Sequence, residues 1–217
     1  MDNTLFDLVG AQIAACHAVA GYLGQADGKS LFEDYFMSDL RGFESHENIR
    51  DYLADRSLPV DGNYRSACEI YERAKLDHIV PYAGVLSALT ELRNDGYPLG
   101  IITDAHSRDA TRRLQKAGLL PFFAGMVSYD MVMVKKPSPE PFIFALEMMR
   151  AGTENTLLLG DSPRRDIRPA AKLGIRTVYA RYGDRFSDVR ECPEADFVID
   201  HMDEFLPIIR SLAAPGE

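Results

Sequence analysis

The first seven residues, Met1-Asp2-Asn3-Thr4-Leu5-Phe6-Asp7, form a short acidic turn that leads directly into a helical pattern of apolar residues. In α/β proteins a turn of this kind follows the carboxyl end of a buried strand, which is where ligands bind. Here the turn opens the sequence, and no strand-like run precedes it. We therefore expect a carboxylate site at this turn, to which later segments contribute.

The segment that follows the turn is predicted to be entirely helical. In its first part Val9, Ile13 and Cys16 recur at steps of three and four, which is the spacing of one helix face. No alternation of apolar and polar residues typical of a strand occurs there. Further helices are predicted over 31–37, 46–53 and 64–76, with a break at 59–62. The predicted domain bounds are 1–8 and 79–217 for an α/β core and 9–78 for a helical domain inserted into it.

Beyond residue 78 the sequence alternates between short apolar runs and helical patterns. Such alternation is typical of a parallel sheet with helices on both faces. Ser138 is the predicted N-cap of one of these helices, with Pro139 at its first position. The fold class is therefore α/β, with a Rossmann-like parallel sheet core. The predicted strands are 99–102, 125–128, 156–159, 177–179 and 197–199.

The composition limits the classes to which the protein can belong. Of 217 residues, 46% are hydrophobic and 26% are charged, as in soluble globular proteins. The net charge of −9 argues against nucleic acid or an anionic membrane as a partner. The sequence shows no apolar run near the roughly 20 residues of a membrane span and no signal-peptide pattern. The scattered Cys16, Cys68 and Cys192 fit reduced thiols, and we expect a cytoplasmic protein.

Four groups of polar residues are predicted to share the carboxyl edge of the sheet. They are Asp2 with its turn, Thr103, Lys136, and Asp161 together with Asp166. Carboxylates are preferred magnesium ligands, a lysine neutralises phosphate charge, and hydroxyl and backbone N–H groups hold phosphate oxygens. One carboxylate can serve as nucleophile and another as general acid or base. The set therefore predicts phosphoryl transfer to a carboxylate.

Each of these residues taken alone has a simpler explanation. Asp2 would cap the following helix, and Asp161 and Asp166 would cap a later one, because acids favour helix N-termini. Thr103 would be an ordinary strand residue, and Lys136 an exposed loop residue. Their occurrence together, in this order, favours the interpretation as a site.

In this order the motifs resemble those of the haloacid dehalogenase-like (HAD) hydrolase superfamily. The helical block resembles the cap inserted after the first motif in the branch that contains phosphoglycolate phosphatase and 2-haloacid dehalogenase. The resemblance extends over nearly the whole chain. The matching segments are D-N-T-L-F-D at 2–7, I-I-T-D at 101–104, K-K-P-S-P-E-P-F at 135–142 and L-L-L-G-D-S-P-R-R-D-I at 157–167.

The resemblance implies a role for each motif residue. Asp2 would be the general acid or base, and its backbone carbonyl would also reach the metal. Thr103 and the backbone N–H of Asp104 would bind phosphate. Lys136, rather than Lys135, matches the lysine that stabilises the transferred phosphate, and Asp166 would either bind the metal or orient this lysine. The implied Mg²⁺ ligands are Asp2, Asp161 and Asp166.

The nucleophilic aspartate that the resemblance implies would lie directly before Met1. The family's first motif is Asp-x-Asp-x-Thr, and Asp2, Asn3 and Thr4 match its last three positions. We therefore expect the given chain to be without this aspartate and without the central strand that carries it. The sheet would then contain a slot lined by unpaired backbone groups. A misplaced start, a trimmed sequence and a catalytically inactive relative are the alternative explanations.

The function that the resemblance implies is Mg²⁺-dependent hydrolysis of a small phosphorylated metabolite through an aspartyl-phosphate. An acid at Asp2 favours this reaction over that of a 2-haloacid dehalogenase, because an alkoxide leaving group needs a proton and a halide does not. A non-catalytic HAD-like binding protein is the other alternative. We expect a monomer or homodimer that binds neither nucleic acid nor membranes.

Overall fold

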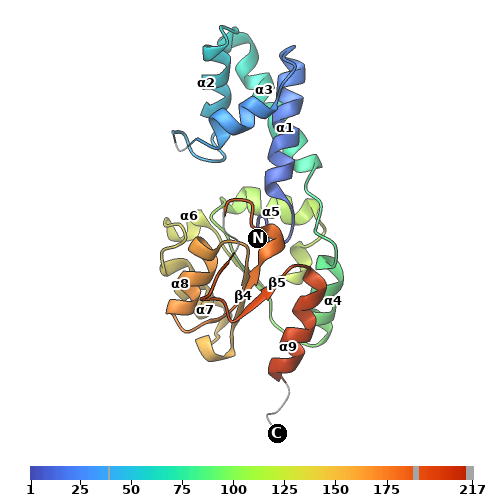
Figure 1. Ribbon diagram of the computed structural model, residues 1–217, viewed down its shortest axis with the longest axis vertical. Helices are drawn as coiled ribbons and strands as arrows, with labels where there is room; N and C mark the ends of the chain where they lie inside the picture. The colour runs from blue at the N-terminus through green and yellow to red at the C-terminus, as the bar shows by residue number, and fades with distance from the viewer. Residues whose placement is uncertain (39, 188–190, 214–217) are drawn as a thin grey trace. The chain divides into compact units, whose positions relative to one another are not determined.

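The computed structural model describes residues 1–38, 40–187 and 191–213, and the chain forms two compact units (Figure 1). The core unit consists of Met1–Asp7 and Val80–Glu217, and the helical unit consists of Leu8–Ile79. Each bound lies one residue from the predicted domain bound. Among the described residues, no helix is both long enough and apolar enough to cross a membrane.

The core unit is an α/β structure built on two parallel sheets, which confirms the predicted class. One sheet pairs two strands, and the other orders three strands with β4 in the middle. All five strands fall within two residues of the predicted bounds, because short apolar runs between turn residues are typical of buried parallel strands. The strands are β1 (Gly100–Ile102), β2 (Gly125–Val127), β3 (Leu157–Gly160), β4 (Arg176–Ala180) and β5 (Phe197–Ile199).

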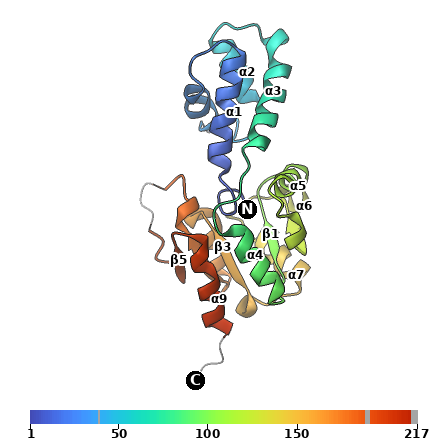
Figure 2. The same cartoon turned by 90° about the vertical axis from the view of Figure 1, so that its right-hand side faces the viewer.

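The two sheets are not joined by a ladder in the described part of the chain. Strand β1 pairs with β2 alone, and β3 pairs with β4 alone. The side chains of Leu157, Leu158 and Leu159 are half-buried, whereas β4 is buried from Thr177 to Ala180. Figure 2 shows β3 and β1 as separate strands of the core. Strand β3 thus has the apolar sequence of a central strand, but its side chains are less buried than those of a central strand.

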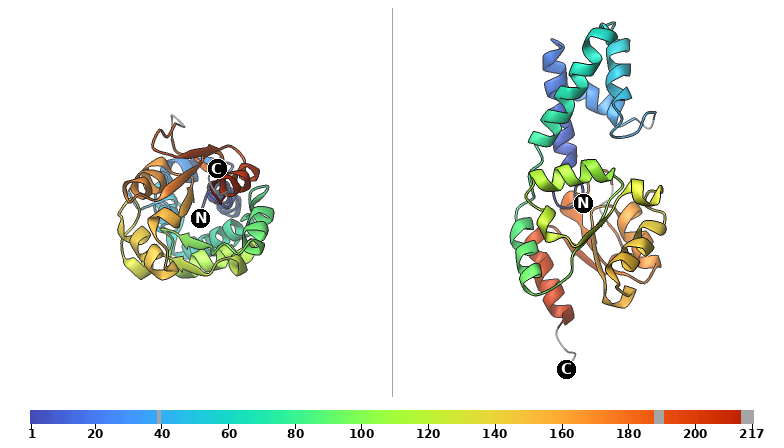
Figure 3. Two further views of the ribbon diagram at one scale, coloured as in Figure 1. Left: turned by 90° about the horizontal axis from the view of Figure 1, so that it is seen from below. Right: turned by 180° about the vertical axis from the view of Figure 1, so that it is seen from behind.

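Helices lie on both sides of these strands (Figures 1 and 3). Helix α7 packs against β1 and β2, α8 packs against β4, and α4 packs against α9. The short α6 was not predicted, because a single helical turn shows no periodicity. The core helices are α4 (Val85–Asn94), α5 (Ser107–Lys116), α6 (Tyr129–Val132), α7 (Glu140–Met149), α8 (Arg168–Lys172) and α9 (Phe205–Ala213).

One predicted helix start is wrong. Helix α7 begins at Glu140 with Pro139 in the N-cap position, so Ser138 lies one residue outside the cap. The Ser138 hydroxyl donates to the Glu140 carboxylate, and no side chain accepts a capping hydrogen bond from the first N–H groups of the helix. The proline ring fixes φ near the helical value in either register, and the sequence therefore could not decide between them.

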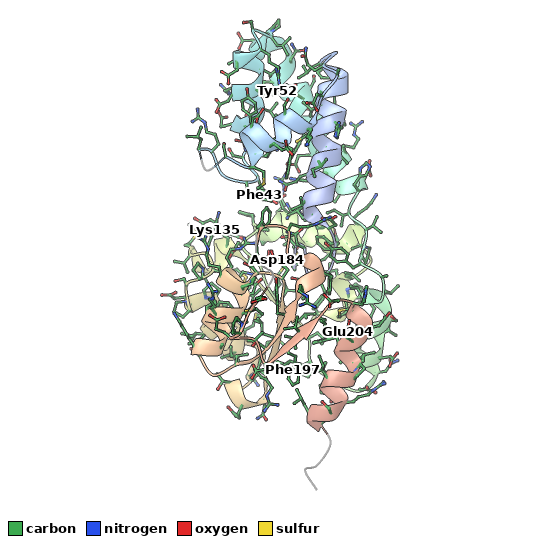
Figure 4. All side chains as sticks on the ribbon, viewed as in Figure 1. Phe43, Tyr52, Lys135, Asp184, Phe197 and Glu204 are labelled. Atoms are coloured by element: carbon green, nitrogen blue, oxygen red, sulfur yellow. The ribbon has the colours of Figure 1, made fainter. Side chains whose placement is uncertain are left out.

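The helical unit is a bundle in which α1 packs against α3. Its core contains Tyr52, labelled in Figure 4, and the stacked rings of Phe36 and Tyr71, whose centroids are 4.8 Å apart. The predicted break at 59–62 exists but lies earlier, at 56–59, because α3 begins directly after Pro59 and Gly62 lies inside it. The elements are α1 (Leu8–Tyr22), a π-helical turn η1 (Leu31–Phe36), α2 (Glu47–Asp55) and α3 (Val60–Asp77).

A group of charged side chains is partly buried in the helical unit. The Glu72 carboxylate lies 2.8 Å from the Lys75 ammonium and 2.9 Å from Nε2 of His46. Burial alone would raise the pKa of Glu72, but the hydrogen bond with His46 and the charge of Lys75 lower it to about 2. Glu72 therefore stabilises the folded unit as long as it is ionised.

We predict that Glu72→Gln lowers the free energy of unfolding at pH 6 but has little effect near pH 2. The folded pKa lies below the ordinary value of 4.5, so the stabilisation is complete above pH 4.5 and is lost as the pH falls towards 2. Urea unfolding followed by circular dichroism measures this difference. Glu69→Gln on the same helix is the control, because Glu69 pairs with an Arg65 that is 92% exposed. An equal loss at both pH values would contradict the prediction.

Candidate functional site

The opening turn is held by its own backbone. The Leu5 N–H donates to the Met1 carbonyl at 2.8 Å, and the Asn3 N–H donates to the Phe6 carbonyl at 2.8 Å. Asn3 has φ +58, a left-handed conformation that asparagine tolerates better than most residues. Asn3 and Thr4 are both buried. The turn therefore presents its side chains in one fixed arrangement.

The Asp2 carboxylate contacts two other elements of the core. One oxygen accepts a hydrogen bond from Arg113 at 3.0 Å, and the other lies 3.4 Å from the Thr103 hydroxyl, which donates to it. Arg113 belongs to α5 and is 3% exposed. The sequence predicts that Thr103, at the end of β1, shares one edge of the sheet with Asp2. In the structure the two side chains are in contact.

Arg113 was missed by the reasoning from sequence. It follows Ala110 by three residues and precedes Leu114, so it occupies the apolar face of α5. A long cationic side chain is rarely buried without a partner. An arginine at the spacing of an apolar helix face was the signal that could have predicted a buried carboxylate nearby.

Asp161, which directly follows β3, is bound to the opening turn. The Thr4 hydroxyl donates to its carboxylate at 2.6 Å, and Asp161 is 3% exposed. Burial and, to a smaller extent, the nearby charge of Asp166 raise the pKa of Asp161 to about 6, and the hydrogen bond from Thr4 acts in the opposite direction. A buried carboxylate in this position binds a proton or another cation more readily than an exposed one.

Lys136 and Asp166 form a buried ion pair. The ammonium lies 2.6 Å from one carboxylate oxygen, and the side chains are 10% and 9% exposed. The other oxygen of Asp166 accepts from the Ser162 N–H at 3.1 Å. Burial would lower the pKa of Lys136, but the charges of Asp166 and Asp104 outweigh it and raise the pKa. The lysine is therefore a fixed cation in this site.

Lys135 points elsewhere. It is exposed, and its ammonium lies 5.2 Å from the ring centroid of Tyr129. Of the two adjacent lysines, Lys136 is thus the one beside the buried acids.

Asp104 acts through its side chain rather than as an exposed cap. Its carboxylate accepts from the Lys136 backbone N–H at 2.9 Å and lies 3.6 Å from the Arg165 guanidinium. The Thr103 hydroxyl also accepts from the Ala105 N–H at 3.2 Å. Asp104 therefore fixes the loop that carries Lys136 beside the end of β1.

A close approach at Gly160 allows this arrangement. A Cβ atom at Gly160 would lie 2.5 Å from Cβ of Asp166, which no packing tolerates. The last residue of β3 must therefore be glycine if Asp166 is to turn back towards Lys136.

The charged groups surround one point. Met1 is buried there, beside Lys136, Asp2, Asp161 and Asp166. The structure thus brings together residues that lie up to 164 positions apart in the sequence.

The carboxylate oxygens of these residues suit a hard divalent cation. In this structure, however, their side chains are not positioned as metal ligands. Among the described residues, no group of three His, Cys, Asp or Glu side chains is close enough to hold a metal ion. However, Asp161 and Asp166 are neighbouring buried carboxylates whose charges oppose one another. A cation with carboxylate-oxygen preference, such as magnesium, would compensate both. The side chain of Asp2 is engaged by Arg113, so its implied metal contact would come from its backbone carbonyl.

The chain is similar to known proteins over most of its length. Residues 1–180 match the family model described as haloacid dehalogenase-like hydrolase. The chain is 31% identical to pyrophosphatase PpaX of Bacillus cereus over 98% of both chains. It is 30% identical to phosphoglycolate phosphatase of Pectobacterium atrosepticum over 75% of this chain and 73% of that one.

Two further comparisons are more limited. The first covers only part of a relative, and the second is a likeness of fold. The chain is 30% identical to glyceraldehyde 3-phosphate phosphatase of Methanocaldococcus jannaschii over 65% of its length, and the match spans 62% of that relative, less than two thirds. The crystal structure of the HAD-hydrolase YfnB from Bacillus subtilis, bound to magnesium, superposes with a TM-score of 0.77 at 18% identity. That alignment covers 97% of this chain and 96% of the other, and it shows a common fold.

We predict that Lys136→Met lowers the free energy of unfolding by about 3 to 5 kcal/mol, because it leaves the buried Asp166 carboxylate without its cation. Lys135→Met, in the exposed neighbour, is expected to change it by less than about 0.5 kcal/mol. The double variant Lys136→Met/Asp166→Asn should recover much of the loss. Urea unfolding measures all three, and equal effects at the two lysines would refute the assigned pair.

Proposed function

Because the chain belongs to the haloacid dehalogenase-like hydrolase family, we propose that it is a Mg²⁺-dependent phosphomonoester hydrolase that forms an aspartyl-phosphate. The observation that carries the proposal is the linked set of strand-end side chains: Thr4 bound to Asp161, and Lys136 bound to Asp166. Carboxylates, a fixed cation and a hydroxyl at one edge of a sheet are the groups that phosphoryl transfer requires.

Asp161, Asp166 and the backbone carbonyl of Asp2 are the proposed magnesium ligands. Bound magnesium would neutralise charge on the phosphate in the transition state. The raised pKa of Asp161 supports this assignment, because a cation would replace the proton that burial favours. In this assignment Thr4 holds one oxygen of Asp161 and so orients the other.

Lys136 and Thr103 are the proposed phosphate-binding side chains. Lys136 keeps its charge because Asp166 and Asp104 surround it, so it can stabilise phosphate oxygens without losing its proton. The Thr103 hydroxyl and the backbone N–H of Asp104 would donate to the same oxygens. Asp104 also positions the lysine loop through its carboxylate.

Asp2 is the proposed general acid and base. It would protonate the leaving alkoxide and then remove a proton from the attacking water. Its carboxylate is already oriented by Arg113, and in the absence of phosphate also by the Thr103 hydroxyl. This orientation supports a role in which the proton must be delivered to one atom of the substrate.

The nucleophile is proposed to be an aspartate directly before Met1, on a strand that lies between β1 and β3. Three observations support this strand: the two sheets are not bridged by any ladder among the residues that the structure describes, β3 is half-buried, and Met1 is buried among the acids. A parallel strand there would pair with both neighbours and cover Leu157–Leu159. It would end beside Asp161 and Lys136.

Two other functions compete with this one. A 2-haloacid dehalogenase would need neither an acid at Asp2 nor magnesium, so the oriented carboxylate of Asp2 favours the phosphatase. A non-catalytic binding protein would gain nothing from burying Lys136 and Asp166, since buried ion pairs give little net stability. The named relatives act on small phosphorylated compounds, and we propose a substrate of that class.

We predict that the chain gains magnesium-dependent hydrolysis of p-nitrophenyl phosphate when an apolar strand ending in aspartate is added before Met1. The strand would supply the nucleophile next to the buried Met1. Release of nitrophenolate measures the reaction. The same extension ending in asparagine is the control and should stay inactive. Equal turnover by the 217-residue chain would disprove the proposed position of the nucleophile.

In the extended chain, Asp2→Asn should slow the hydrolysis of an alkyl phosphate about 10²- to 10⁴-fold, because the alkoxide then leaves without a proton. Nitrophenolate leaves without needing a proton. The first step with p-nitrophenyl phosphate should therefore slow much less than the first step with the alkyl phosphate. Rapid-quench measurement of aspartyl-phosphate formation from the two substrates tests this difference. Equal losses would remove Asp2 from the acid role, whereas Asp161→Asn should affect both substrates alike.

A further inference from the structure

The segment that follows β4 contacts three separate pieces of the core unit. Tyr182 and Gly183 lie against the opening turn, and Arg185 reaches Asp7, the last core residue before the helical unit. Tyr182 also contacts Tyr82, three residues into the returning chain. Tyr182 and Gly183 reach the opening turn through its backbone, and Gly183 also lies against the side chain of Asp161.

The first contact braces the turn that carries Asp2. The Tyr182 hydroxyl donates to the Thr4 carbonyl at 2.7 Å. A Cβ atom at Gly183 would lie 1.9 Å from the Asn3 carbonyl oxygen, so the backbone itself is packed against the turn. Thr4 also donates to Asp161, a proposed metal ligand. A shift of Tyr182 would therefore move Thr4 and, through it, Asp161.

The second set of contacts joins the two connections to the helical unit. Phe6 in the outgoing connection forms an antiparallel bridge with Pro81 in the returning one. The Tyr82 N–H donates to the Leu5 carbonyl at 2.9 Å. The rings of Tyr82 and Tyr182 meet edge to face with centroids 5.1 Å apart. Both connections are thus tied to one another and to the segment after β4.

The segment is itself held in place. Asp184, labelled in Figure 4, is 3% exposed and accepts from the backbone N–H groups of Phe186 and Ser187, each at 3.0 Å. The Tyr179 hydroxyl of β4 donates to its other oxygen at 2.5 Å. Asp184 therefore fixes the direction in which the next side chain, Arg185, leaves the core.

We propose that Tyr182, Gly183 and Arg185 form a clasp that couples both connections to the turn carrying Asp2 and Thr4. Tyr182 and Gly183 hold the turn, and Arg185 holds the outgoing connection through Asp7. The coupling itself is independent of the reaction. Its consequence for catalysis, that Tyr182 and Arg185 are positioning residues, rests on the proposed function.

The two halves of the clasp differ in strength. Arg185 and Asp7 are 43% and 29% exposed, so their ion pair is weak and is screened by salt. The Tyr182 bond and the Gly183 contact are packed against buried backbone. The clasp is therefore weaker at the connection than at the turn.

Amide hydrogen exchange measured by NMR tests the clasp without requiring activity. The reporters are the Tyr82 N–H, bonded to Leu5, and the Asn3 N–H, bonded to Phe6. Arg185→Met should speed exchange of both about two- to five-fold at low salt, the range expected for a weak ion pair. Arg185→Lys should restore most of the protection. Arg181→Met is the matched control, because Arg181 is 39% exposed and pairs with Asp200 in the same way.

Salt and a second variant separate the two halves. Raising the salt concentration should speed exchange at Tyr82 in the wild type but not in Arg185→Met. Tyr182→Phe should speed exchange at Asn3 more than at Tyr82. Unchanged exchange at both amides in Arg185→Met, or an increase spread equally over β4 and α9, would overturn the clasp. Failure of the extended chain to hydrolyse phosphate would remove the proposed function and leave this result intact.

Discussion

The structure of the core depends on the burial of two neighbouring carboxylates, Asp161 and Asp166, in one turn after β3. A buried carboxylate must be neutralised or hydrogen-bonded, because removal from water costs several kcal/mol per ion. Asp166 is compensated by Lys136 and a backbone N–H. Asp161 receives the Thr4 hydroxyl and retains a raised pKa of about 6. The negative charge of Asp161 is therefore not fully compensated by its neighbours, and a bound cation would compensate it.

This constraint explains why distant parts of the chain end at the same place. Thr4 comes from the opening turn, Lys136 from the loop after α6, and Asp166 from the segment before α8. Parallel strands bring these segments to one edge, because each strand ends there before its helix begins. Asp104 then fixes the Lys136 loop through a backbone hydrogen bond. The lysine is held by its backbone as well as by its charge, which suits a group that must stay in place when phosphate arrives.

The strands and the strand-end residues could be predicted because they depend on local patterns. Apolar runs such as Leu157–Leu159 are bounded by turn residues, and the acids follow directly after them. Other features depend on contacts between distant residues and leave no local signal. Gly62 stands inside a helix because α3 packs along α1, and tertiary packing outweighs its low helix propensity. The contacts of Tyr182 with Thr4 join residues 178 positions apart, and periodicity carries no information about them.

Arg113 and Arg185 hold the opening turn at its two ends in different ways. Arg113 is buried and binds Asp2, so its cation cannot be replaced by water and the carboxylate is held firmly. Arg185 is exposed and binds Asp7, where water and salt compete with it. The turn is therefore held more firmly beside Asp2 than at Asp7, because the ion pair of Arg113 is buried and that of Arg185 is exposed to water.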